Sequence, residues 1–193
     1  MRASILLTAV FFAAVSASAG TYEIDPVHSQ VAFKIRHLVS KVSGRFTIFS
    51  GTIGYVPGKP EAWTVEAKID PASINTDNEK RDAHLKSPDF FDVAKCPEMS
   101  FKSSKVGDVK GSSAKIYGVL TMHCTSKPVV LGLDVGGTGR DPFSGTERAG
   151  FSAKIKLDRK DFGIVWNKVL DDGGVLIGDE VEVSIEVEAP ASK

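Results

Sequence analysis

The chain alternates apolar and polar residues with a period of two over much of its length. In QVAFKIRH, the side chains of Val31, Phe33 and Ile35 fall on one face of an extended chain, opposite Lys34 and Arg36. The same period recurs in WTVEAKID, FSAKIKLD and VEVSIEVE. Since successive side chains of a strand point to opposite faces, this pattern predicts an antiparallel sheet with one face exposed to water.

Counting such segments predicts about eight strands, separated by turn-forming stretches such as PGKP, DPFSG and DDGG. They are expected at residues 22–36, 44–56, 61–70, 98–106, 113–123, 127–136, 146–158 and 178–188. Long strands with one wet face must bury the other, in a two-sheet sandwich or in a barrel that also removes exposed edges. We favour an all-β fold, an eight-stranded antiparallel β-barrel, and the sandwich is the alternative.

One charged segment, NTDNEKRDAHLK, interrupts the strands between the third and the fourth. Thr76 or Asn75 suits the N-cap of a helix, Asp77 and Glu79 suit its first turn, and Pro88 ends it. The sequence therefore predicts a short helix of about ten residues at this point of the chain.

This helix is too polar to be buried in a core, and RDAHLKSPDFF ends in two adjacent aromatic residues. We expect it to lie across one end of the barrel with Leu85, Phe90 and Phe91 turned inward. Such a helix is a lid if the interior holds a ligand, and a plug if the interior is filled with side chains.

The first 19 residues have the composition of an export signal. Arg2 precedes an apolar run from Ile5 to Val15, and Ala17-Ser18-Ala19 suits a cleavage site. The run is shorter than the roughly 20 residues that span a bilayer. We predict a signal peptide at 1–19, a single domain at 20–193 and a periplasmic location, with a retained N-terminal anchor as the alternative.

Charge and motifs narrow the function classes. Without Arg2, 23 basic and 24 acidic side chains remain, and this balance argues against nucleic acid as the partner. The chain has no nucleophile elbow, no HExxH and no glycine-rich phosphate loop, so we expect no enzyme and no catalytic cofactor. We expect no metal site either, because the four histidines lack the spacing of a zinc motif. They are His28, His37, His84 and His123.

Several stretches together resemble the YceI-like family of secreted polyisoprenoid-binding proteins. They are YEIDPVHSQVAFKIRHL, SGRF, GTI, NEKRDAHLKSPDFFDVAKCPEMSFKS, GVLTMHCTSKPV, RKDFGI and IGDEVEVSIEVE. The resemblance runs from about Tyr22 to Glu188. It implies a lipocalin-like barrel of eight strands with a helix after the third strand, and a cavity that holds a long isoprenoid chain.

The resemblance favours the lid over the plug. The burial of a branched hydrocarbon tail, at about 25 cal/mol per Å² of apolar area, supplies ample binding energy without a charged contact. The alternative is that the same apolar side chains pack a solid core. The candidate wall and mouth residues are Val31, Phe33, Ile35, Phe46, Ile48, Ile53, Trp63, Val65, Phe90, Phe91, Phe101, Val119, Phe151, Ile155, Phe162 and Trp166.

The polar head of such a lipid would lie near the mouth, where the candidates are His37, Arg81, Asp82 and His84. A phosphate head requires a cation or backbone donors, whereas a quinone requires one or two neutral donors. Alternatively, His84 pairs with Asp82 or Asp89 and holds the lid.

The expected cargo is a polyprenyl phosphate or an isoprenoid quinone, held for transport, storage or sequestration. A fatty acyl cargo and a ligand-free structural barrel are the alternatives. Transient membrane contact and a homodimer are left open.

Two cysteines stand where the family usually has none, as far as the resemblance goes. Cys96 and Cys124 flank a predicted hairpin around GDVKG, and the midpoint of their numbers lies in that turn. Residues so placed lie opposite each other in a hairpin, and an exported protein meets an oxidising compartment. We predict a Cys96–Cys124 disulfide that closes the open end of the hairpin; two buried free thiols are the alternative.

Overall fold

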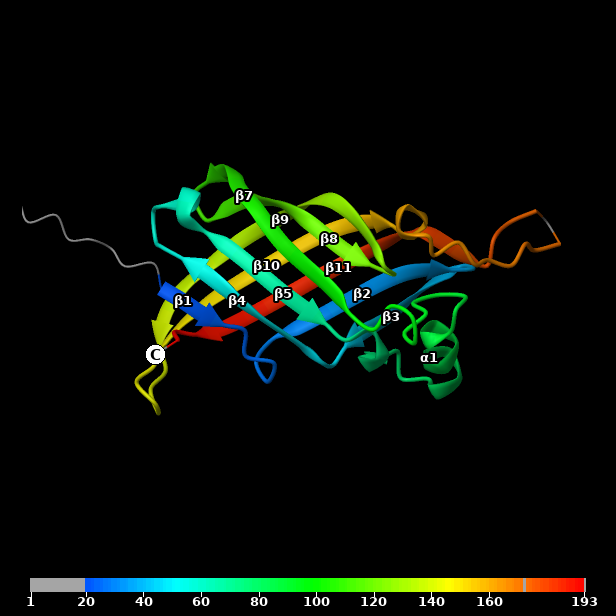
Figure 1. Ribbon diagram of the computed structural model, residues 1–193, viewed down its shortest axis with the longest axis horizontal. Coiled ribbons are helices and arrows are strands. Elements are labelled where there is room, and N and C mark those ends of the chain that lie inside the picture. Colours follow the sequence, from blue (N-terminus) through cyan, green and yellow to red (C-terminus); the bar gives the residue numbers. More distant parts are fainter. Residues whose placement is uncertain (1–19, 172, 193) are drawn as a thin grey trace, which may run out of the picture.

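The computed structural model describes residues 20–171 and 173–192, so the predicted signal peptide lies outside the described residues. The fold is all-β, with one α-helix and short 3-10 turns in the described part of the chain (Figure 1). The strands are β1 Gly20–Glu23, β2 Gln30–His37, β3 Ser40–Phe46, β4 Phe49–Tyr55, β5 Thr64–Ile69, β6 Ile74–Asn75, β7 Met99–Lys110, β8 Ser113–Met122, β9 Thr125–Arg140, β10 Glu147–Asp158 and β11 Ile177–Pro190. The helix α1 spans Glu79–Lys86, and the 3-10 turn η3 spans Arg159–Phe162.

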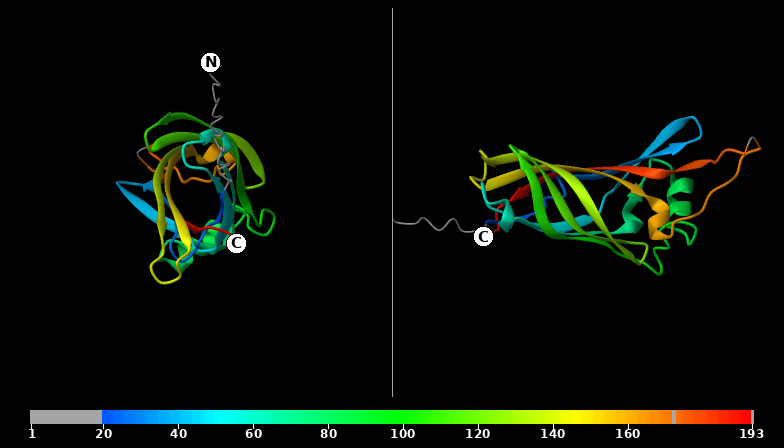
Figure 2. Two further views of the ribbon diagram at one scale, coloured as in Figure 1. Left: turned by 90° about the vertical axis from the view of Figure 1, so that its left-hand side faces the viewer. Right: turned by 90° about the horizontal axis from the view of Figure 1, so that it is seen from above.

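All strands belong to one antiparallel sheet in the order β1-β4-β5-β7-β8-β9-β10-β11-β2-β3-β6. The sheet curls into a half-barrel, which the end-on view of Figure 2 shows as a rounded cross-section. β3 and β4 follow each other across Thr47 and Ile48, yet β3 pairs with β2 and β4 with β5. An isolated bridge between Tyr22 and Ala191 brings β1 beside the end of β11. The curl therefore gives the sheet an inner, apolar face.

The prediction of eight strands was wrong, and with it the position of the helix in the strand order. The predicted strand 22–36 is divided into β1 and β2 by a turn at residues 26–28, and 44–56 is divided at Thr47 and Ile48. The two-residue strand β6, paired with β3, adds another. The helix occupies the predicted stretch of chain but follows β6. Periodicity does not reveal these breaks, because the apolar pattern continues across them.

The predicted N-cap of the helix was also wrong. The side chain of Asn78, and not that of Asn75 or Thr76, accepts a hydrogen bond from the backbone N–H of Arg81 at 3.0 Å. Ser87 forms the C-cap directly before Pro88, as the conformational restriction on a residue preceding proline leads one to expect. The helix therefore has eight residues.

An aromatic cluster closes the end of the half-barrel opposite to α1. The ring of Tyr55 lies 5.0 Å from that of Trp63, 5.3 Å from that of Phe151 and 6.3 Å from that of Tyr22, measured between centroids. Burial and the hydrogen bond from its hydroxyl to Glu147, 2.5 Å long, raise the pKa of Tyr22 to about 12. This end is therefore filled with side chains.

Candidate ligand-binding cavity

An outer cavity of about 410 Å³ opens beneath α1, between the helix and the ends of β2, β3, β10 and β11. Its walls are largely apolar. They include Val31, Phe33, Ile35, Val42, Phe46, Leu85, Phe90, Phe91, Met122, Leu157, Ile164, Trp166, Leu176, Ile177, Val181 and Val183. This volume is in the range of small-molecule sites.

An inner cavity of about 170 Å³ continues toward the aromatic cluster. Among the described residues, the side chains with polar atoms in its lining are those of Ser50, Tyr55, Trp63 and Thr64, and the rest are apolar. The residues shared by the two linings are Val31, Phe46, Met122, Leu157 and Val183. The two cavities are therefore adjacent chambers that share these five apolar side chains.

Aromatic side chains from the helix segment and from the loop after η3 meet over the outer cavity. The ring centroid of His84 lies 5.0 Å from that of Phe90 and 4.8 Å from that of Trp166, both edge-on. Phe91 meets Phe46 of β3 at 5.7 Å in the same way. Nε2 of His84 lies 2.9 Å from the Asp89 carboxylate, so His84 forms the local pair that was the alternative to head-group binding.

Two head-group candidates, Arg81 and Asp82, hold the start of α1 in place. Nε of Arg81 donates to the hydroxyl of Thr76, and Nη2 donates to the Thr76 carbonyl, both at 2.7 Å. Asp82 accepts from the hydroxyl and the backbone N–H of Thr76 at 2.5 and 2.9 Å. Thr76 is itself buried. These contacts fix the helix against the sheet, and they occupy the side chain of Asp82, which does not line the cavity.

The mouth of the outer cavity is basic. The polar side chains in its lining are His37, Thr76, Lys80, Arg81, His84 and Arg159, and among the described residues no aspartate or glutamate joins them. Neither the ammonium of Lys80 nor the imidazole of His37 has a hydrogen bond or ion pair within the described part of the chain. These two groups are therefore available to an electron-rich head group.

Arg159 anchors the loop that forms one wall of the mouth. Its buried guanidinium donates to the carbonyl oxygens of Ile164 and Trp166, both at 2.8 Å, and to that of Gly178 at 3.0 Å. Nη2 also donates to Asp179 at 3.0 Å. Arg159 was not among the residues predicted from the sequence, because it stands in the charged run DRKD at 158–161 and the sequence does not distinguish it from its neighbours.

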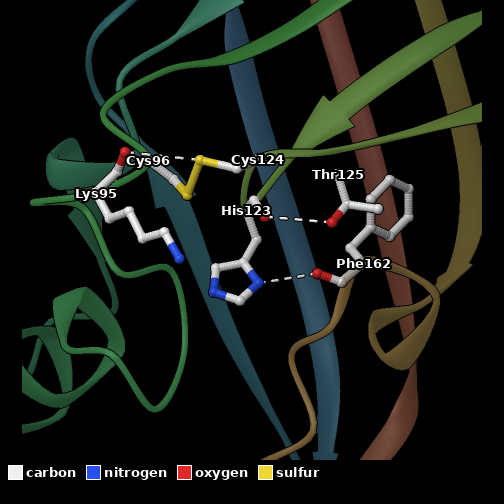
Figure 3. Close-up of a disulfide and its surroundings, with 6 residues drawn as sticks. All are labelled: Lys95, Cys96, His123, Cys124, Thr125 and Phe162. Carbon is white, nitrogen blue, oxygen red and sulfur yellow. Dashed lines mark hydrogen bonds between the residues drawn. A yellow bond between two sulfur atoms is a disulfide. The ribbon is translucent and has the colours of Figure 1, made fainter.

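The predicted Cys96–Cys124 disulfide is confirmed, with the two Cα atoms 5.4 Å apart (Figure 3). The predicted geometry was wrong. The β7–β8 turn lies at Gly111 and Ser112, beyond the predicted midpoint, and the ladder of this pair ends at Ser100 and Thr121, so neither cysteine belongs to it. Cys96 precedes β7, and Cys124 lies in the two-residue turn between β8 and β9.

The disulfide fastens the segment after α1 to a strained turn. His123 and Cys124 have φ angles of 50° and 55°, the left-handed region that such turns normally give to asparagine and glycine. Nδ1 of His123 donates to the carbonyl oxygen of Phe162 at 2.9 Å, as Figure 3 shows. The turn is therefore attached to the segment after α1 by the disulfide, and to η3 by this hydrogen bond.

The structure places most predicted wall residues beside the two cavities. Val31, Phe33, Ile35, Phe46, Phe90, Phe91 and Trp166 line the outer one, and Val31, Phe46, Ile53, Trp63, Val65, Phe101, Phe151 and Ile155 line the inner one. The prediction that Ile48 and Val119 line the cavity was wrong, because both side chains are exposed. The chain turns at Ile48, and Val119 points outward from β8. Phe162 is buried but lines neither cavity.

Sequence reasoning missed the wall formed by the irregular loop after η3. Ile164, Leu176 and Ile177 line the outer cavity, but they lie between Gly163 and the start of β11, where no strand period exists. Val42 was missed because β3 begins before the predicted strand at 44–56. Met122 and Leu157 were missed for another reason: they lie in predicted strands, and periodicity does not show which inward residue meets a cavity.

The described residues contain neither a metal-binding cluster nor a membrane-spanning helix. No group of three or more His, Cys, Asp or Glu side chains among them is placed to hold a metal ion. Within residues 20–171 and 173–192, no helix has the length and hydropathy needed to cross a bilayer.

A curled antiparallel sheet that encloses an apolar cavity beneath a short helix defines an all-β protein of the half-barrel class. Residues 22–189 match the model of the YceI-like domain, and the chain belongs to that family. A UPF0312 protein of Vibrio cholerae is 37% identical over 161 residues, covering 82% of this chain and 85% of the relative. A UPF0312 protein of Pseudomonas syringae pv. tomato is 39% identical over 165 residues, covering 84% and 85%.

Solved structures show the same fold. A YCEI protein of Campylobacter jejuni is 33% identical, with a TM-score of 0.70 over 82% of this chain and 90% of that chain. BcnA of Burkholderia cenocepacia has a TM-score of 0.76 at 21% identity, over 86% and 99%. A domain from Saccharophagus degradans, described as polyisoprenoid binding, has a TM-score of 0.65 at 17% identity, over 89% and 98%.

Proposed function

We propose that this protein is a binding protein, not an enzyme, for a polyisoprenoid amphiphile, and that it acts in the periplasm after export. The observation that carries the proposal is the gradient of polarity along the two chambers. The outer chamber has a basic mouth, and the inner one is apolar up to the aromatic cluster. An amphiphile with a small polar head and a long hydrocarbon tail is complementary to this gradient.

The head of the cargo lies at the mouth in this proposal, close to Lys80 and His37. Since the outer cavity has several basic groups and no acidic side chain among its described lining residues, it favours an anionic head over a neutral one. A polyprenyl phosphate fits best, and an isoprenoid quinone is the second candidate because a carbonyl oxygen accepts from the same donors. The Saccharophagus degradans domain that shares the fold is described as polyisoprenoid binding, which supports the same cargo class.

The test is the native mass of the protein purified from a periplasmic extract without detergent, before and after extraction with organic solvent. We expect an excess mass that leaves with the solvent, and fragmentation then identifies the cargo. If a fatty acid is identified in this fraction, the cargo is an acyl chain and not an isoprenoid. A bare chain that also takes up neither polyprenyl phosphates nor quinones would contradict the proposal and favour a structural barrel.

A further inference from the structure

Five exposed apolar side chains gather at the end of the molecule where the outer cavity opens, and we call them the tip surface. They are Leu38, Val39, Val165, Val169 and Val175. The structure describes eleven exposed large apolar residues, and the other six are scattered over the rest of it. Isolated exposed valines are ordinary, but a group beside a cavity mouth indicates contact with a partner.

The tip surface is formed by two neighbouring hairpins. Leu38 and Val39 form the turn between β2 and β3, and the backbone N–H of Leu38 donates to the carbonyl of Leu176 at 3.0 Å. Val169 and Val175 face each other across an isolated bridge in the second hairpin. Figure 2 shows, in its right-hand view, that both hairpins lie at the end of the molecule that carries α1 and that the orange hairpin before β11 extends beyond the helix.

The tip surface borders the cavity directly. Leu38 follows His37, Val165 lies between Ile164 and Trp166, and Val175 precedes Leu176. His37, Ile164, Trp166 and Leu176 all line the outer cavity. The same short segments therefore form the wall of the mouth and the exposed apolar surface around it.

The turn at Leu38 and Val39 lacks the small or polar residues that are typical of a water-exposed turn. Leu38 has a φ of 51°, at the position that a two-residue turn of this kind normally gives to glycine. Val39 beside it is 98% exposed. A bulky residue in strained backbone, with its apolar neighbour in water, costs free energy in the free protein, and contact with an apolar phase would recover part of it.

The tip surface is flanked by charged side chains of both signs, since Asp171 of the second hairpin is exposed as well as the cations. Arg36 and Lys168 are exposed, and neither pairs with a carboxylate among the described residues. Lys41 is exposed as well, although it pairs with Glu182 at 2.7 Å. Arg36 and Lys168, together with Lys80 at the mouth, leave three cations without a carboxylate partner among the described residues. Apolar side chains beside such cations suit the surface of a bilayer that contains anionic lipid, where apolar burial and electrostatic attraction add.

We propose that the tip surface docks the cavity mouth onto an anionic phospholipid bilayer. The inference rests on the proposed function, because a water-insoluble cargo is best exchanged where the mouth meets the lipid phase. Leu38 and Val39 enter the interface between headgroups and acyl chains, Val169 and Val175 enter beside them, and Arg36 and Lys168 lie at the headgroups.

The test is flotation with vesicles of phosphatidylethanolamine and phosphatidylglycerol that contain no isoprenoid. It uses protein without residues 1–19, because their apolar run would bind vesicles by itself. We expect the protein to float with these vesicles, and less with vesicles of phosphatidylcholine alone. The variant L38G/V39S should bind about tenfold more weakly, since it removes two apolar side chains from the interface.

The variant L38G/V39S suits the backbone of the turn and leaves the cavity lining unchanged, so its thermal stability should be retained. Val169→Asp provides a second variant, on the other hairpin, with the same expected loss. The matched control is Phe143→Ser, which removes a side chain that is 99% exposed from the loop between β9 and β10, at the opposite end of the molecule. Vesicle binding of this control should be unchanged.

Three outcomes would overturn the proposal: no flotation of the unmodified protein, equal flotation of L38G/V39S, or an equal loss with Phe143→Ser. A dimer in solution that L38G/V39S dissociates would assign the tip surface to a second copy of the chain instead. Because the vesicles carry no cargo, these outcomes are separate from the native-mass test. Cargo uptake without flotation would support the proposed function and contradict the proposed docking to a bilayer.

Discussion

At the scale of single residues, the basic mouth gives a direct test of the head group. The ammonium of Lys80 lines the outer cavity without a partner among the described residues, whereas Lys86, on the same helix, does not line it. We expect Lys80→Gln to weaken binding of a polyprenyl phosphate by about three- to tenfold, because one charged contact is lost. Binding of a quinone should be almost unchanged, and Lys86→Gln should change neither. Competition against a fluorescent prenyl probe measures all three.

Asp25 makes the stability of the fold depend on pH. Hydrogen bonds from His28 and then from Arg148 lower the pKa of its carboxyl from 3.8 to about 2. A carboxyl with a lower pKa in the folded chain than in the unfolded one stabilises the fold above the unfolded value, and this contribution is lost as pH falls from about 4 toward 2.

We expect Asp25→Asn to lower the free energy of unfolding at neutral pH by about 2 kcal/mol and to flatten the profile between about pH 4 and 2. Urea unfolding at a series of pH values measures this. Glu61→Gln, an exposed residue outside this cluster, is the control. If the free energy of unfolding of the Asp25 variant falls with pH as steeply as that of the unmodified protein, another group is responsible for the acid sensitivity.

Residue identity also marks the limit of sequence reasoning. Alternation placed Phe33, Ile53 and Phe151 on the inner face, and the structure agrees. It also placed Ile48 inside, where the backbone turns and exposes the side chain. The role of Arg159 depends on three carbonyl groups that the loop brings to it, and such contacts between distant segments leave no period in the sequence.

At the scale of elements, the disulfide determines how firmly the lid is held. Removal of Cys96–Cys124 by a double change to alanine should destabilise the fold by about 3 to 4 kcal/mol if the loss of chain entropy dominates. Amide hydrogen exchange should become faster in α1 and in the segment up to Cys96, while β10 and β11 keep their protection, because the staple holds that segment and not those strands. Unchanged exchange in α1 would show that the Thr76 contacts hold the lid without the disulfide.

The loop after η3 depends on one buried guanidinium. Arg159→Met leaves three backbone carbonyls without their donor and leaves Asp179 with Lys160 alone, so we expect a loss of about 3 to 5 kcal/mol in the free energy of unfolding. The control is Lys160→Met, which removes an exposed ion pair with the same Asp179 and should cost less than about 1 kcal/mol. Thermal unfolding of both variants compares them, and equal losses would contradict the anchoring role of Arg159.

The elements themselves were more predictable than their connections. The strands from β7 to β11 were placed within a few residues, because each is long and has one wet face. The divisions between β1 and β2 and between β3 and β4 escaped prediction, since a bend interrupts hydrogen bonding without interrupting the apolar pattern. The disulfide was found for a simple reason: its two cysteines lie near the same end of one hairpin, even though bulges shift the register.

At the scale of the whole molecule, the two chambers predict selection by tail length. Leu157 lines both cavities, so Leu157→Trp should fill the passage between them. We expect this variant to bind farnesyl phosphate nearly as well as the unmodified protein, and a long polyprenyl phosphate at least about tenfold more weakly. Lys156→Trp, at the adjacent outward position, is the control for a new indole on β10. Equal loss for both chain lengths would mean that the tail does not reach the inner chamber.

The closed aromatic end gives the molecule a direction. Because Tyr22, Tyr55 and Trp63 fill that end, a bound chain has to enter tail first and leave head first through the mouth that admitted it. An acceptor at the mouth therefore meets the reactive head group while the tail is still shielded from water. Under the proposed function, a tube closed at one end, unlike one open at both ends, would present its cargo in the orientation in which a membrane can receive it.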